Sequence, residues 1–146
     1  MSEENDLNYL LDRSLMEKVY FNFLSNAFKN TPNNCNISVH IISEPLDKLI
    51  KDYPLKNEIF NEQVNQYIIL KIKDSGVGIE SNELEKIFTP FYQVAQNEHS
   101  SSGTGLGLSL SKAIIEMHHG TVWAESPEGS GAVFICILPV SKTIYK

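Results

Sequence analysis

The sequence lacks the features that mark membrane-spanning, secreted and nucleic-acid-binding proteins. No apolar run approaches the roughly 18 to 20 residues that cross a bilayer, and the opening MSEENDLNYL is too acidic for a signal peptide. The net charge of −6 comes without any run of lysine or arginine, which disfavours a nucleic-acid partner. We therefore expect a cytoplasmic domain that contacts neither membrane nor nucleic acid, although a longer parent protein could itself be anchored in a membrane.

Cysteine is scarce, with only Cys35 and Cys136 in 146 residues. Cys136 lies within the apolar run AVFICIL, so buried thiols in a reducing compartment are expected rather than a disulfide. The four histidines and two cysteines show none of the spacings of a zinc site. His118 and His119 instead stand at the predicted end of a helix, where they suit the negative end of its dipole.

Glycine is absent from the first 75 residues, and seven of the eight glycines that follow fall into three groups. These lie at 76 and 78, at 103, 105 and 107, and at 129 and 131. Glycine lets the backbone turn sharply and approach a ligand closely. The middle group, in GTGLGLSLSK, runs into a predicted helix whose unpaired N–H groups and partial positive charge suit a phosphate. From this stretch alone, a flexible loop that ends in a helix stays an open alternative.

The order of predicted elements favours one α/β domain over residues 1–146. Helical patterns cover 15–30, 82–88 and 106–119, and strand patterns cover 36–43, 67–74, 121–126 and 132–139. Ser14 and Glu17 are placed as a capping box for the first helix, and Gly120 as the residue that ends the last. Residues 44–66 are too long for a hairpin, and we interpret them as a peripheral insertion. This order predicts a sheet that helices cover on one face.

Three polar side chains share a narrow stripe of the first helix. At about 100° per residue, Asn22, Asn26 and Lys29 fall close together. The opposite arc is apolar; it contains Met16, Tyr20, Phe23, Leu24, Ala27 and Phe28. An asparagine oxygen suits magnesium that holds a polyphosphate, and a lysine can neutralise phosphate charge. On this helix alone, an ordinary solvated face is the competing interpretation.

A second candidate group follows the strand YIILKIK. The motif DSGVGI begins with Asp74, which would stand at the end of the strand, and continues with glycines that give a flat ligand room to approach. A carboxylate accepts hydrogen bonds from an amine such as the exocyclic amino group of adenine. Taken singly, this motif is equally compatible with a strand that ends in a turn.

Five motifs occur in one order along nearly the whole chain: NFLSNAFKNT, DSGVGI, IFTPFY, GTGLGLS and GSGAVF. This set resembles the ATP-binding catalytic domain of sensor histidine kinases, a member of the Bergerat-fold group that includes gyrase-type ATPases. The resemblance implies a two-layer α/β sandwich, in which a mixed sheet is covered by helices on one face. It also implies that ATP and Mg²⁺ bind under a mobile lid at about residues 89–104. The insertion at 44–66 resembles the version found in some large hybrid sensors of two-component systems.

The resemblance implies roles for individual residues. Asn26 would bind Mg²⁺, Asn22 and Lys29 would face the phosphates, and these three are the expected catalytic residues. Asp74 would hold the adenine amine, partly through water. The other residues that it places in the adenine pocket, at the lid hinge or around the phosphates are Asn30, Gly76, Gly78, Ile79, Phe88, Phe91, Gly103, Thr104, Gly105, Leu106, Gly107 and Leu108.

Asn22 distinguishes a kinase from a hydrolase. Gyrase-like, mismatch-repair and chaperone ATPases resemble one another in a glutamate that lies four residues before the magnesium asparagine and activates water. Here that position is Asn22, an amide that cannot usefully accept a proton. By the resemblance, the γ-phosphate would be transferred to a histidine on a separate dimerisation domain, and from there to a response regulator receiver domain. Neither His118 nor His119 has the context of such a phosphoacceptor. An anti-sigma-type serine kinase would share the nucleotide site, but a glutamate is expected near its magnesium asparagine.

Some residues depart from the family pattern. The stretch from Ile87 to Ser111 contains no lysine or arginine, and Gln93 stands where relatives often have a basic residue that reaches the γ-phosphate. Ala132 replaces a hydroxyl residue beside the adenine site, and His119 replaces the first glycine of a pair. These departures leave two hypotheses: an active histidine kinase domain, which we favour, and a nucleotide-binding regulatory module with little or no catalysis.

Overall fold

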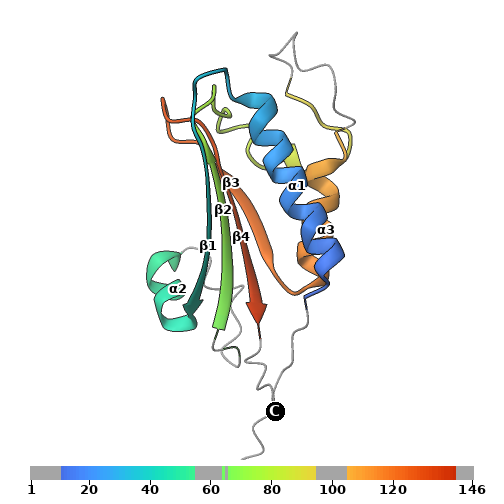
Figure 1. Cartoon of the computed structure of the whole chain (residues 1–146), viewed down its shortest axis with the longest axis vertical. Helices are drawn as coiled ribbons and strands as arrows, with labels where there is room; N and C mark the ends of the chain where they lie inside the picture. Colours follow the sequence, from blue (N-terminus) through green and yellow to red (C-terminus); the bar gives the residue numbers. More distant parts are fainter. Residues whose placement is uncertain (1–10, 55–63, 65, 95–104, 141–146) are drawn as a thin grey trace, which may run out of the picture.

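A computed structural model describes residues 11–54, 64, 66–94 and 105–140 of the chain (Figure 1). In chain order, these residues form α1 (Arg13–Asn30), β1 (Ile37–Pro45), α2 (Leu46–Asp52), β2 (Gln66–Asp74), the 3-10 turn η2 (Lys86–Phe88), α3 (Gly107–Met117), β3 (Thr121–Glu125) and β4 (Val133–Val140). Within these ranges, no helix combines the length and the apolar character that crossing a membrane requires.

The four strands form one sheet in the order β1-β2-β4-β3, and every neighbouring pair is antiparallel. The described sheet is therefore antiparallel, whereas we expected a mixed one. β3 does run parallel to β2, but β4 lies between them. The reason is that β3 and β4 form a hairpin, and the second strand of this hairpin, rather than the first, pairs with β2.

α1 and α3 cover one face of the sheet, as expected for a two-layer α/β sandwich (Figure 1). Ile72 of β2 aligns with Phe134 of β4, so both side chains lie on this face. The rings of Phe23 and Phe88 pack on that of Phe134, with centroids 5.6 and 6.3 Å away. Because Phe23 comes from α1 and Phe88 from η2, this aromatic cluster fixes both segments over the sheet.

The opposite face of the sheet is covered as well, which we did not predict. Leu49 of α2 is fully buried there and packs in one cluster with Ile69 and Ile137. Tyr53, the residue after α2, meets the ring of Trp123 edge to face at 5.4 Å. The helix of the 44–66 insertion is thus packed into a second apolar layer and is not peripheral.

The helix ends differ from the expected ones. α1 begins earlier than predicted, because Asp12 caps it by accepting a hydrogen bond from the N–H of Leu15 at 2.9 Å, so the capping box is wrong. At the end of α3, His119 takes the left-handed conformation that we assigned to Gly120, with φ of 61°. The predicted helix at 82–88 consists of turns that end in η2.

His118 joins the two helices at their far ends. The backbone N–H of Asp12 points at Nε2 of His118 at 3.1 Å, and Nδ1 lies 2.7 Å from the carbonyl oxygen of Ile114. A backbone N–H can only donate, so Nε2 accepts and the ring proton is on Nδ1, which donates to Ile114. His118 therefore satisfies a carbonyl of the last turn of α3, as expected for a histidine at a helix end.

The two cysteines have different surroundings, and the expectation of two buried thiols is confirmed only for Cys136. Burial raises the pKa of Cys136 to about 12, so its thiol is uncharged and unreactive at neutral pH. Cys35 is exposed, in the connection between α1 and β1.

The packing predicts very different costs for two phenylalanines of α1. Phe23→Ala removes a fully buried ring and should lower the free energy of unfolding by about 3 to 5 kcal/mol. Phe21→Ala is the matched control two residues away; its ring is 63% exposed, and the loss should stay below about 1 kcal/mol. Urea denaturation of both variants measures this, and equal losses would contradict the assignment of the core.

Candidate functional site

The described residues among those predicted for the site come from the second half of α1, the loop after β2, the segment around η2 and the start of α3. The turn between β3 and β4, which supplied none of them, also reaches Asp74. The loop after β2 lies so close to α1 that a Cβ on Gly76 would overlap the backbone oxygen of Asn30. Glycine at position 76 is therefore required by this close approach.

Asp74 is the buried acidic residue of this site, with 3% of its surface exposed. Its Oδ1 accepts hydrogen bonds from the backbone N–H of Gly76 at 2.9 Å and of Ala132 at 3.2 Å. Its Oδ2 accepts no hydrogen bond from the described residues. This oxygen is also not one of the fully buried, unbonded atoms, so a ligand can reach it. One oxygen is thus fixed by two segments, and the other is available to a ligand donor such as an amine.

Asn22 ties α1 to the start of α3. Its Nδ2 donates to the carbonyl oxygen of Gly107 at 3.2 Å and to Oγ of Ser111 at 3.1 Å. The adjacent N-cap residue of α3, Leu106, provides no side-chain hydrogen bond to the helix. The first N–H groups of α3 therefore carry no side-chain cap, which is the state in which a helix start can receive an anion.

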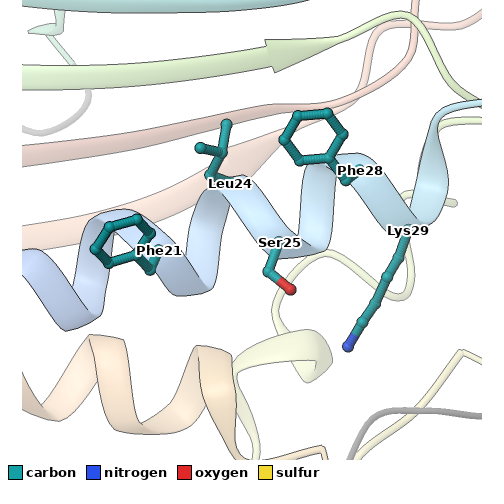
Figure 2. Close-up of a pocket in the computed structure, with 5 residues that line it drawn as sticks. All are labelled: Phe21, Leu24, Ser25, Phe28 and Lys29. Carbon is teal, nitrogen blue, oxygen red and sulfur yellow. The ribbon is translucent and has the colours of Figure 1, made fainter.

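The other polar residues of α1 lie along the same stripe. Nδ2 of Asn30 donates to the backbone oxygen of Asn26 at 2.9 Å and approaches its Oδ1 at 3.4 Å. Lys29 is exposed, and none of the described acidic groups lies within ion-pair distance of it. Figure 2 shows its ammonium group extending away from α1. An amide oxygen and a cation one turn apart are a suitable set for a metal-bound polyphosphate.

Two residues at the predicted lid hinge are in contact. The backbone N–H of Phe91 donates to the carbonyl oxygen of Gly105 at 2.9 Å. Gly105 has φ of +73°, and a Cβ there would lie 2.8 Å from the backbone of Phe91, so a side chain is excluded. Phe88 is buried, whereas Phe91 is 74% exposed. The hydroxyl of Tyr92 bonds to Glu83, which raises the pKa of Tyr92.

The remaining predicted residues have less distinct surroundings. Ile79 and Leu108 pack against the core beneath α1 and α3. Gly78 lies in the loop after β2. Gly103 and Thr104 lie outside the described residues, as does most of the predicted lid.

Two serines that were not predicted from the sequence connect segments of the site. Ser111 holds the side chain of Asn22, and Oγ of Ser126 accepts a hydrogen bond from the N–H of Ile79. The signal for Ser111 was its place one turn after Gly107, on the face of α3 that meets α1. Ser126 was hidden in the turn sequence SPEGSG, where serine is common.

An apolar pocket lies along α1, beside Lys29. It has a volume of about 510 Å³ and is lined by Phe21, Leu24, Ser25, Phe28 and Lys29 (Figure 2). Phe28 lies at the edge of the apolar arc of α1 and is 65% exposed. Leu110 and Met117 of α3 are also exposed. We call the exposed surface of Phe21 and Phe28 on α1 the outer face.

The sequence matches the family model of histidine kinase-, DNA gyrase B- and HSP90-like ATPases over residues 11–142. It is 33% identical over 145 residues to "Histidine kinase P4" of Formosa agariphila, covering 97% of this chain and 9% of that protein. It is 35% identical over 129 residues to a sensor protein kinase WalK of Staphylococcus aureus, covering 88% of this chain and 27% of the relative. The chain thus spans a small part of these relatives.

Solved structures agree with this match. A nucleotide-free catalytic domain of histidine kinase ThkA superposes with a TM-score of 0.61 at 30% identity, covering 88% of this chain and 68% of that one. ThkA in complex with the response regulator protein TrrA gives a TM-score of 0.58 at 28% identity, covering 92% and 31%. Fold, motif order and family match agree, and the chain belongs to the histidine kinase-, DNA gyrase B- and HSP90-like ATPase family, as a domain of the histidine kinase type.

Proposed function

We propose that this domain binds Mg·ATP and presents its γ-phosphate to a histidine on a separate dimerisation domain. The observation that carries the proposal is the buried carboxylate of Asp74, with one oxygen fixed by two backbone donors and the other available. This arrangement lies at the same end of the sheet as Asn26, Lys29 and the uncapped start of α3.

The adenine end of the nucleotide would be read by Asp74. Its Oδ2 would accept a hydrogen bond from the exocyclic amine, while the N–H groups of Gly76 and Ala132 keep the carboxylate in one orientation. Because the carboxylate is already held before a ligand arrives, binding would not have to order it.

The phosphate end would face Lys29 and the first N–H groups of α3. The side-chain oxygen of Asn26 would hold Mg²⁺. To do so, it would give up its 3.4 Å contact with Nδ2 of Asn30. A bound Mg²⁺ would supply neutralisation of the phosphate charge. What the chain itself contributes is positioning, because Asn22 keeps α1 and the start of α3 in register.

Transfer rather than hydrolysis is supported by Asn22. Its amide nitrogen is engaged by Gly107 and Ser111, and an amide does not take a proton from water at neutral pH. An external nucleophile is then required. The kinase names of the relatives favour this function over a nucleotide-binding module without catalysis. The complex of ThkA with a response regulator supports a receiver domain as the later acceptor.

The outer face is the surface on which the dimerisation domain would dock. It is apolar, it is exposed, and its pocket reaches Lys29, which would face the phosphates (Figure 2). A histidine that attacks the γ-phosphate has to approach from outside α1 and α3, so a helix that carries it would cover this face.

Asp74→Asn should weaken ATP binding by roughly ten- to a hundred-fold, because a hydrogen bond to a charged group is lost. Isothermal titration calorimetry with ATP and magnesium measures the affinity. Asp47→Asn, an exposed aspartate on α2 at the opposite face, is the matched control and should bind as the parent does. An unchanged affinity in Asp74→Asn would refute the adenine assignment.

Asn26→Ala should reduce phosphoryl transfer by roughly a hundred-fold or more, since the ligand that orients Mg²⁺ is removed. The assay mixes the chain with the histidine-bearing domain of the same protein and ATP labelled at the γ-phosphate. Asn33→Ala, an exposed asparagine beyond the end of α1, controls for loss of an amide. Tight ATP binding in the unmodified chain without any transfer would leave a regulatory module.

Phe21→Ala should raise the KM for the dimerisation domain about ten-fold and leave the Kd for ATP unchanged, because an exposed anchor is lost. Transfer rates measured against concentration of the dimerisation domain separate the two constants. Ile42→Ala removes an exposed apolar side chain from β1 and should change neither. If Phe21→Ala changes ATP affinity instead, docking lies elsewhere.

A further inference from the structure

Ser126 stands directly after β3, at the start of the turn that leads to β4. Its Oγ accepts a hydrogen bond from the N–H of Ile79 at 2.8 Å and donates one to the carbonyl oxygen of Gly131 at 2.6 Å. The directions are fixed, because a backbone N–H can only donate and a carbonyl can only accept. One half-buried hydroxyl therefore connects the loop after β2 to the turn between β3 and β4.

These two segments are the ones that hold Asp74. The loop donates to its Oδ1 from Gly76, three residues before Ile79. The turn donates to the same oxygen from Ala132, the residue after Gly131. The spacing between the two donors sets the orientation of the carboxylate, and Ser126 bridges the two segments that carry these donors. We infer that Ser126 is a positioning residue that sets how Asp74 reads the amine of adenine, an inference that rests on the proposed function.

Among the described residues, no second hydroxyl bonds to the N–H of Ile79 or the carbonyl of Gly131. Ala132 carries no hydroxyl, and Oγ of Ser126 lies in the space that a side chain on Gly78 would fill, 2.8 Å from its Cβ position. Ser75 bonds to Asn36 and so ties the loop to the segment before β1, in another direction. Ser126→Ala would leave the N–H of Ile79 and the carbonyl of Gly131 without their partner, so the loop and the turn would move relative to each other.

The test compares two nucleotides that differ only in the group that Asp74 reads. ATP carries the exocyclic amine, and purine riboside triphosphate lacks it, while their phosphates and magnesium are the same. Titration calorimetry of the unmodified chain at a temperature where all variants are folded gives the ratio of the two affinities. Ser126→Ala should lower the preference for ATP by roughly three- to ten-fold, with little change in binding of the amine-free nucleotide.

Ser130→Ala is the matched control, since Ser130 lies in the same turn and its exposed Oγ donates only to Pro127, at 3.1 Å. It should keep the original preference. A purely structural role of Ser126 would lower the melting temperature and leave the preference of the folded protein unchanged, and that result would overturn the inference. If the unmodified chain binds neither nucleotide, the proposed function itself fails, which is a distinct outcome.

Discussion

A carboxylate that is removed from water has to be hydrogen-bonded, and the site depends on how the chain meets this requirement at Asp74. Both donors to its Oδ1 are backbone N–H groups, so they can reach it only where two glycine-containing segments come close to the end of β2. The same contacts close the turn between β3 and β4 over the sheet. The packing of this end of the fold, and the adenine recognition that we propose, thus depend on one buried carboxylate.

The helix pair is positioned by polar contacts at both ends of its length. Asn22 joins α1 to the start of α3 near the phosphate end, and His118 joins the end of α3 to the chain just before α1. Between these ends, apolar side chains of both helices pack on the sheet. The polar stripe of α1 is therefore held at a fixed distance from the helix start that would receive phosphate, which is the positioning that phosphoryl transfer requires.

The sequence was sufficient to predict the four strands and the helices α1 and α3, because apolar periodicity is a local signal. The segments of the candidate site were predicted from the resemblance to a family, since each motif alone was equally compatible with a loop or a turn. The sequence was insufficient for features that depend on tertiary contacts. Phe28 lies at the edge of the apolar arc, and only the position of α1 over the sheet leaves it exposed. The capping of α1 by Asp12 and the second apolar layer around Leu49 likewise depend on neighbours distant in sequence. Which serine of the last turn bridges to the loop could not be read from composition.

The second apolar layer separates two parts of the domain. Leu49 and Tyr53 contact side chains on the face of the sheet that points away from α1. Asp74 belongs to the other face, so the two sets of residues are connected only through the backbone of the strands. A change in this second layer would therefore reach the proposed nucleotide site only through the strands that carry both.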